Sequence, residues 1–312
     1  SELKTLDPSC GSGHFLVAVM LMLVPLRMQL EGLNAQQAID VVLRDNIHGL
    51  ELEQRCVELA AFALALEAWR YPDAGGYRPL PEMQLACSGL SVQAAKDEWK
   101  ALALDKRNLS IALDWMHDTF KDAPVLGSLI NPAKSSAAKI VEWDELSAVL
   151  NQALEQDSHN LDSVNQHEAA IVAQGLAKAA QLLAGKYQWV VTNVPYLARG
   201  KQDKVLQEFA DRHYPEGKSD LATVFLDRCL EFCVQGGSTS IVLPQNWLFL
   251  TSYRKLREKL LKRDTWNLVA RMGPRAFETI GGEVVQAALI SITHGQSSEG
   301  DGLFADQQAA TH

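Results

Sequence analysis

Residues 3–30 read LKTLDPSCGSGHFLVAVMLMLVPLRMQL, and this stretch decides the fold class. A short strand, LKTLD, leads through the small residues CGSG into a long apolar helix, which Pro25 is expected to kink or end. Such a turn lets backbone N–H groups at a helix N-terminus approach a ligand. Gly11 and Gly13 would make the turn and Asp7 would accept a hydrogen bond from the ligand. A purely structural turn is the alternative.

Strand-like and helix-like segments alternate along most of the chain. The segment VVLRDNIHGLEL ends a helix and becomes a strand, EQRCVELAAFALALEAWR is a helix, and MQLACSGL is a third strand. Further strands are predicted at QWVVTNV, STSIVLP, WNLVARMG and VVQAALISITH, with helices at LATVFLDRCLEFCVQ and SYRKLREKLLKR. This alternation predicts an α/β fold with a doubly wound, mostly parallel sheet.

A stretch of about 95 residues separates the third and fourth strands, which is too long for an ordinary connection. Its pattern is mostly helical, so residues 91–185 are predicted to be a helical insertion. It would divide a cofactor-binding half, 1–90, from a second half, 186–296, that holds the substrate pocket. Residues 297–312 are predicted to be a polar, frayed tail.

Composition favours a globular protein. Hydrophobic residues make up 47% of the chain, and the charged fraction is 21% without long low-complexity runs. No apolar stretch reaches the roughly 20 residues of a membrane span, so we expect a cytoplasmic protein with no membrane contact. The five cysteines are scattered and odd in number, which favours reduced thiols, and no histidine spacing indicates a metal site.

Net charge argues weakly against a nucleic-acid partner. The formal charge is −9, whereas Lys and Arg supply most of the affinity for phosphates. Basic residues do gather in one part of the sequence: Arg254, Lys255, Arg257, Lys259, Lys262, Arg263, Arg271 and Arg275. They would either contact nucleic acid or form a solvated helix face.

The strand HGLELE ends in an acidic residue, Glu51, from which a carboxylate can bind two ribose hydroxyls. Glu53 is the competing acid. Glu51 lies about 40 residues beyond the glycines, farther than the roughly 20 typical of the NAD fingerprint, and the glycine pattern is not G-x-G-x-x-G. NAD is therefore disfavoured.

Residues 192–197, TNVPYL, follow a hydrophobic strand and resemble the NPPY motif of amino-group methyltransferases. Together with DPSCGSGHF, HGLELE, KSDLATVF, STSIVLPQNWL and RAFETIGGEVVQAAL, they occur in the order found in gamma-type N6-adenine DNA methyltransferases, including restriction-linked and BREX-type phage-defence enzymes. The resemblance covers most of the chain outside the insertion. It implies a class I methyltransferase fold, S-adenosylmethionine as cofactor and site-specific methylation of adenine N6 in DNA.

The chemistry explains the motif, because the lone pair of an exocyclic amine is delocalised until acceptors pull its protons out of the ring plane. The resemblance implies that the Asn193 side-chain oxygen and the Val194 carbonyl are these acceptors. Tyr196 would stack on the extruded base. The family usually has proline at 194, but Pro195 already restricts Val194 to an extended conformation.

The resemblance also assigns binding roles elsewhere in the chain. Cofactor contacts fall on residues of both halves: Asp7, Gly11, Gly13, Glu51, Asp220 and Phe225. Phe277 matches an aromatic residue that packs on the flipped base. For Phe225 the alternative is ordinary helix core, and for Phe277 it is a loop aromatic folded into the core.

Double-stranded DNA is the expected partner, through a recognition domain absent from this chain, and defence-system subunits are expected to associate with the protein. The isolated chain is accordingly expected to be a poor enzyme. Two alternatives stay open: a methyltransferase acting on protein glutamine or RNA, and a non-catalytic DNA-binding subunit with a degenerate motif.

Overall fold

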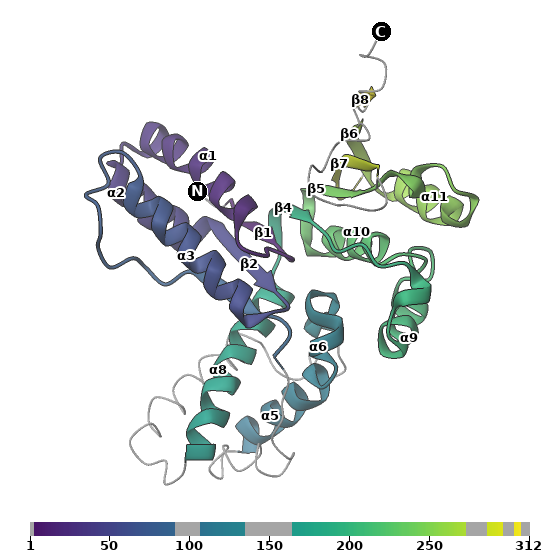
Figure 1. Ribbon diagram of the computed structural model, residues 1–312, viewed down its shortest axis with the longest axis horizontal. Helices are drawn as coiled ribbons and strands as arrows, with labels where there is room; N and C mark the ends of the chain where they lie inside the picture. Colours follow the sequence, from purple (N-terminus) through teal and green to yellow (C-terminus); the bar gives the residue numbers. More distant parts are fainter. Residues whose placement is uncertain (1–2, 91–106, 135–163, 273–285, 296–302, 307–312) are drawn as a thin grey trace. The chain divides into compact units, whose positions relative to one another are not determined.

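The structure is a computed structural model that describes residues 3–90, 107–134, 164–272, 286–295 and 303–306. Two compact units make up the chain. The helical unit is Cys10–Gly185, and the sheet unit combines Ser1–Ser9 with Lys186–His312. Figure 1 labels their helices and strands.

The helical unit packs helices against two parallel strands. Its elements are α1 (His14–Glu31), α2 (Ala35–Val41), a π-helical turn (Val42–Asn46), β2 (Ile47–Glu51), α3 (Gln54–Arg70), β3 (Gln84–Cys87), α5 (Arg107–Phe120), α6 (Ala123–Leu126) and α8 (Val164–Ala184). Strands β2 and β3 are in register from His48 opposite Gln84 to Glu51 opposite Cys87. Helices α3 and α8 both contact β3, while α1 packs on α2 and α3. The described part of the predicted insertion is thus helical.

Helix α1 begins after Gly13 and ends before Gly32, both in the left-handed conformation that glycine adopts without strain. Pro25 lies inside the helix, so of the two expected outcomes the helix does not end there, and a kink stays a prediction. The buried Arg27 side chain donates from Nε to Asn46 Oδ1 at 3.2 Å, which joins α1 to the π-helical turn. This polar contact fixes the side of α1 that faces the unit.

The opposite face of α1 is apolar and exposed, through Leu21, Met22, Leu26 and Leu30. From its apolar sequence this first helix was expected to be buried, and this is corrected for its exposed face. By length and composition α1 is also the one described helix that would suffice to cross a membrane, although 33% of it is buried in the structure. At 18 residues it stays below the roughly 20 apolar residues of a membrane span.

The sheet unit carries the larger part of the sheet. Its elements are β1 (Thr5–Asp7), β4 (Tyr187–Asn193), α9 (Lys204–His213), α10 (Leu221–Phe232), β5 (Cys233–Pro244), α11 (Arg254–Arg263), β6 (Thr265–Arg271), β7 (Ala287–Thr293) and β8 (Leu303–Asp306). The described strands of this unit lie in the order β1-β4-β5-β7-β6-β8. Strand β7 is antiparallel to β5 and β6, and the remaining described pairs are parallel. The predicted α/β fold with a mostly parallel sheet is confirmed.

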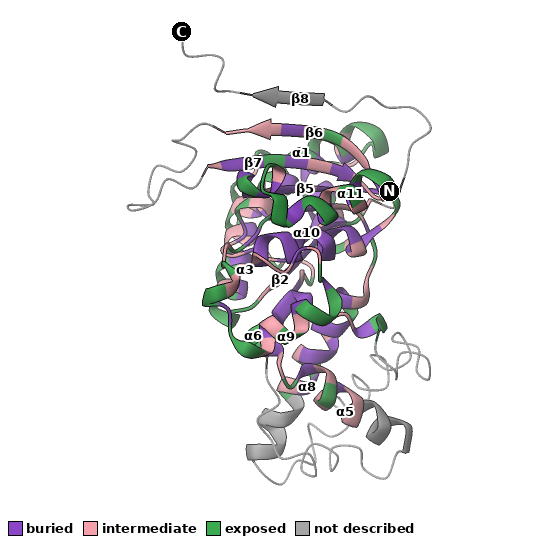
Figure 2. Ribbon diagram, turned by 90° about the vertical axis from the view of Figure 1, so that its right-hand side faces the viewer, coloured by how far each residue is buried: buried purple, intermediate pink, exposed green. Residues whose placement is uncertain are grey.

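Helix α10 is the core helix of the sheet unit, buried along almost its whole length (Figure 2). It contacts β4 and β5. Strand β8 is an unexpected element, because the tail 297–312 was predicted to be frayed. Residues Leu303–Asp306 instead pair with β6, from Leu268 opposite Leu303 to Arg271 opposite Asp306. An added strand completes the backbone hydrogen bonding of an otherwise open edge.

Candidate functional site

The TNVPYL segment lies where β4 ends and the chain leaves the sheet. Asn193 is the last residue of β4 and stands opposite Val242 of the parallel strand β5. Its side chain is exposed, whereas Val194 is 3% exposed. The valine therefore anchors the turn in the core, while the asparagine amide is presented at the carboxyl edge of the strand.

Two of the predicted catalytic residues contact each other directly. The Tyr196 hydroxyl donates to Asn193 Oδ1 at 3.3 Å. Burial raises the pKa of the Tyr196 phenol to about 12, and the Asp220 carboxylate acts in the same direction. The phenol therefore stays protonated at neutral pH and remains a donor that orients the Asn193 amide.

Asp220 joins this segment to the start of α10. Its Oδ1 accepts from the Ala222 N–H at 2.9 Å as the helix N-cap and from the Leu197 N–H at 3.4 Å. The Leu221 N–H in turn donates to the Leu197 carbonyl at 3.0 Å. Asp220 was predicted to contact the cofactor; the structure gives it a supporting role for the residues after Tyr196, and the cofactor contact stays a prediction.

Phe225 lies in α10 and is 6% exposed, so its alternative assignment as helix core fits the structure. Asp7 ends β1 and is 1% exposed; its Oδ1 accepts from the Ser9 N–H at 3.1 Å. Asp7 thus closes the turn after β1. The ligand contacts predicted for both residues stay predictions.

The two glycines of the CGSG turn meet different constraints. Gly13 has φ +87°, and a Cβ there would lie 3.0 Å from Cα and Cβ of Ala60. The close approach of the start of α1 to α3 therefore requires glycine at this position. Gly11 has φ +52°, but no atom lies within 4 Å of its would-be Cβ. Gly13 therefore serves packing, whereas Gly11 combines a glycine conformation with open space.

Glu51 is tied to this turn. Its Oε2 accepts from the Gly11 N–H at 2.8 Å and its Oε1 from the Leu52 N–H at 2.8 Å. The Glu53 N–H also donates to Oε1, at 3.4 Å. A carboxylate has about four acceptor sites, so Glu51 keeps capacity for about one further donor. The competing acid, Glu53, is exposed at the N-cap of α3 and makes no side-chain cap. The contact of either acid with a ribose stays a prediction.

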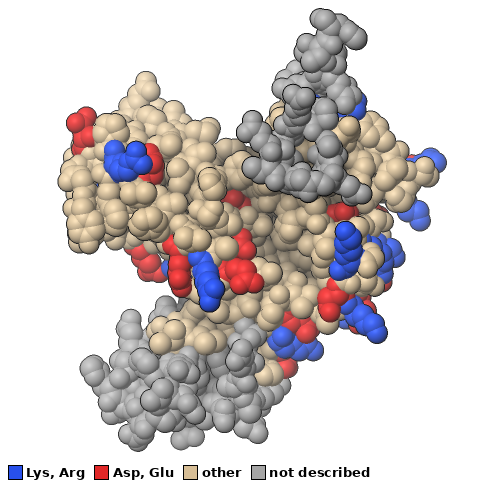
Figure 3. Space-filling model, in the orientation of Figure 1, with Lys and Arg blue, Asp and Glu red and all other residues tan. Residues whose placement is uncertain are grey.

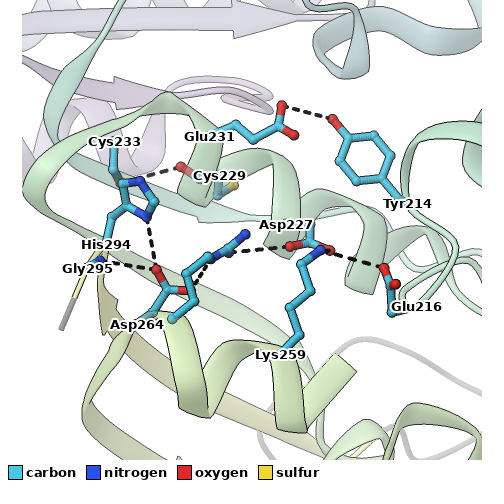
Figure 4. A network of polar contacts seen from close by, with 11 residues as sticks. Tyr214, Glu216, Asp227, Cys229, Glu231, Cys233, Lys259, Asp264, His294 and Gly295 are labelled. Carbon is cyan, nitrogen blue, oxygen red and sulfur yellow. Dashed lines mark hydrogen bonds and ion pairs between the residues drawn. The ribbon is translucent and has the colours of Figure 1, made fainter. Parts of the chain in front are cut away.

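Two cations of the basic cluster, Lys259 and Arg263, are bound to acidic groups within the sheet unit (Figure 4). Lys259 Nζ lies 2.9 Å from Asp227 Oδ2, and Arg263 Nε lies 2.7 Å from Asp264 Oδ2; both carboxylates are buried. Figure 3 likewise shows basic side chains beside acidic ones. Neither a uniform nucleic-acid surface nor a simply solvated face describes α11, because its inward cations neutralise buried carboxylates.

Phe277 and Arg275 lie outside the described residues. Sequence reasoning missed Gln202 and Gln207, whose side chains bond the backbone after Tyr196. No pattern in the polar segment GKQDKVLQ indicated them, because their partners are carbonyl groups of the loop. Among the described residues, no three His, Cys, Asp or Glu side chains group closely enough to hold a metal ion.

Comparison with known proteins gives relatives across most of the chain. The family described as Eco57I restriction-modification methylase matches residues 45–277. An adenine-specific methyltransferase PglX of Lacticaseibacillus casei (strain Zhang) is 31% identical over 299 residues, covering 91% of this chain and 23% of that protein. An adenine-specific methyltransferase BrxX of Escherichia coli O9:H4 (strain HS) is 29% identical, covering 95% of this chain and 26% of that protein. The chain thus spans about a quarter of these relatives.

Among solved structures, the ATP-dependent Type ISP restriction-modification enzyme LlaBIII bound to DNA has a TM-score of 0.56 at 13% identity. The match covers 98% of this chain and 18% of that one. At this identity the likeness concerns the fold, and it agrees with the α/β architecture described above.

Proposed function

Because the chain belongs to the Eco57I restriction-modification methylase family, we propose that it is the catalytic core of an enzyme that methylates N6 of adenine in DNA. The contact between Asn193 and Tyr196 at the end of β4 carries this proposal. The Asn193 amide oxygen, oriented by a protonated phenol, is the acceptor that we propose for the incoming amine.

The residues of the TNVPYL turn divide the work of activating the amine. Asn193 Oδ1 and the Val194 carbonyl each accept a hydrogen bond from one N–H of the amine, which localises the lone pair on nitrogen and makes it nucleophilic. Tyr196 orients Asn193 and offers its ring to the extruded base. No strong general base is required, because the N–H becomes acidic once nitrogen has bonded the methyl group, and the surplus proton is then released to solvent.

S-adenosylmethionine supplies the electrophilic methyl group when bound. The residues of the helical unit fit its nucleoside part, since Glu51 retains acceptor capacity and the space beside Gly11 is open. Asp7, Asp220 and Phe225 are the further contacts we propose for it. Each is a separate assignment that a cofactor-bound structure will test.

The biological setting follows from the relatives. We infer that the protein acts in the cytoplasm in restriction-modification or phage defence, with double-stranded DNA held by parts of the full-length protein outside these 312 residues. Other subunits of the defence system are its proposed partners. The pairing of Lys259 and Arg263 with buried carboxylates supports this division, because these two cations of α11 are not available to phosphates.

The experiment compares full-length wild type with Asn193→Ala, using tritiated cofactor and unmethylated DNA. We expect Asn193→Ala to abolish methyl transfer and to leave cofactor affinity by calorimetry nearly unchanged, since Asn193 contacts only the amine. Asn267→Ala, which alters an exposed asparagine of β6, is the matched control and should keep wild-type activity.

Hydrolysis of the labelled product identifies the acceptor. Label in N6-methyladenine supports the proposal. Parallel reactions offer RNA or protein in place of DNA, and label only in RNA or in protein glutamine would move the activity to those substrates. Wild-type rates in Asn193→Ala would remove TNVPYL from catalysis and favour a non-catalytic DNA-binding subunit.

A further inference from the structure

The segment between Tyr196 and α9 is held in place by side chains although it has little regular structure. Gln202, just after the 3-10 turn Arg199–Lys201, is 6% exposed, and its Nε2 donates to the Leu197 carbonyl at 2.9 Å. That carbonyl also accepts from the Leu221 N–H at 3.0 Å. The carbonyl group of Leu197, the residue after Tyr196, is therefore held by two donors.

A second glutamine holds the first. Gln207, on α9, donates from Nε2 to the Gln202 carbonyl at 2.9 Å and to the Arg199 carbonyl at 3.1 Å. The backbone that carries Gln202 is thus attached to a regular helix. The position of the Gln202 backbone is thereby fixed, and so is the direction from which its side chain donates to the Leu197 carbonyl.

The amide of Gln202 is used as a donor. Its Oε1 is buried and has no hydrogen-bond partner among the described residues. A flipped amide would set this oxygen against the Leu197 carbonyl, so the orientation is determined by repulsion. An unsatisfied buried acceptor is uncommon in proteins, and keeping one here indicates that the donor at the other end of the amide matters.

We propose that Gln202 is a positioning residue for the methyl-transfer site, an inference that rests on the proposed function. By holding the Leu197 carbonyl it sets the path of the chain at Tyr196, whose hydroxyl orients Asn193 Oδ1. The acceptors of the amine must match its geometry closely, and a misplacement of about 1 Å costs on the order of 100-fold in rate.

The first test is Gln202→Met in the full-length protein. Methionine keeps the length and burial of the side chain, and it removes both the donor and the unsatisfied acceptor. We expect Tm to stay the same or rise, the cofactor Kd to stay unchanged, and kcat to fall roughly 10- to 100-fold. Gln188→Met, at the amino end of β4, is the matched control and should keep wild-type kcat.

The second test is Gln202→Glu, read as a pH profile. A protonated carboxyl group can still donate to the Leu197 carbonyl, whereas an ionised one cannot, and burial raises the pKa of a carboxyl group. We expect kcat of this variant, relative to wild type, to recover as pH falls. A merely structural role would lower Tm and give no such recovery.

The two proposals fail differently. If wild type methylates adenine and Gln202→Met stays within about twofold of its kcat, the positioning role is refuted and the proposed function stands. If full-length wild type transfers no methyl group, the proposed function fails and the role of Gln202 fails with it.

Discussion

At the scale of single residues, Glu51 joins two parts of the helical unit. The carboxylate accepts from the Gly11, Leu52 and Glu53 backbone N–H groups, so it shapes the turn in addition to the ribose contact that we propose for it. Removing the whole side chain would therefore change the stability of the turn and cofactor binding together, and the two effects could not be separated. An isosteric change separates the two.

We expect Glu51→Gln to weaken cofactor binding by about 1–3 kcal/mol, because a charge-assisted acceptor of the ribose hydroxyls is lost. Its amide oxygen can still accept one backbone N–H, so the loss of stability should be smaller than in Glu51→Ala. Calorimetry on the full-length protein measures the first quantity and urea unfolding the second. Unchanged cofactor affinity would refute the ribose assignment.

The glycines of the turn give a second residue-scale prediction. Gly13→Ala should destabilise the protein by roughly 2–4 kcal/mol, since a left-handed backbone and a 3.0 Å contact with Ala60 both penalise a Cβ. Gly11→Ala should cost only about 1–2 kcal/mol, from its backbone conformation alone. Urea unfolding followed by circular dichroism tests this order, and equal losses would contradict it.

At the scale of elements, α11 is attached to the rest of the sheet unit by ion pairs as well as by its apolar side chains. Asp227 of α10 is bonded by Lys259 at 2.9 Å, and Asp264 by Arg263 at 2.7 Å and by the His294 ring at 2.9 Å (Figure 4). The carboxylates are the buried members of these pairs. Loss of a cation would therefore leave a buried, uncompensated carboxylate, which destabilises the folded state.

Lys259→Met should therefore destabilise the protein by about 1–3 kcal/mol. The loss is limited because Arg263, 3.5 Å from Asp227, still neutralises part of the charge of that carboxylate. Arg254→Ala, which breaks the exposed pair with Glu258, should change stability by no more than about 0.5 kcal/mol. Chemical denaturation of both variants gives the comparison. Similar losses in the two would mean that burial of Asp227 is not the cause.

At the scale of the whole molecule, buried phenols make stability depend on alkaline pH. Burial raises the pKa of Tyr187, Tyr196 and Tyr214 above the usual value, to about 12 for Tyr196. Below about pH 10 the phenols are protonated in both states and the stabilisation is complete. As pH rises from about 10 through about 12, the unfolded chain releases these protons first, and stability falls.

Denaturant unfolding at about pH 8 and about pH 10.5 should show this loss, with phenolate absorbance reporting the titration. Tyr214→Phe should show a smaller loss over the same interval, because one buried phenol is gone. A pH-independent free energy of unfolding in wild type would contradict the prediction.

Local signals in the sequence determined the order and type of most elements. The small-residue turn between LKTLD and the apolar helix, and the hydrophobic run before TNVPYL, gave β1, α1 and β4 within a few residues. These features depend on backbone conformation and hydrophobic periodicity, both of which are written in neighbouring residues. The same locality let the sequence place Asn193 and Tyr196 at a strand end.

Only the tertiary structure decided which side chains work together. That Glu51 bonds Gly11, that Lys259 neutralises Asp227 and that Gln202 holds the Leu197 carbonyl are contacts between residues brought together by packing. The exposed face of α1 and the pairing of β8 with β6 were misjudged for the same reason. Hydrophobicity along a segment does not specify which neighbour covers it, and a polar side chain does not reveal its partner until the chain has folded.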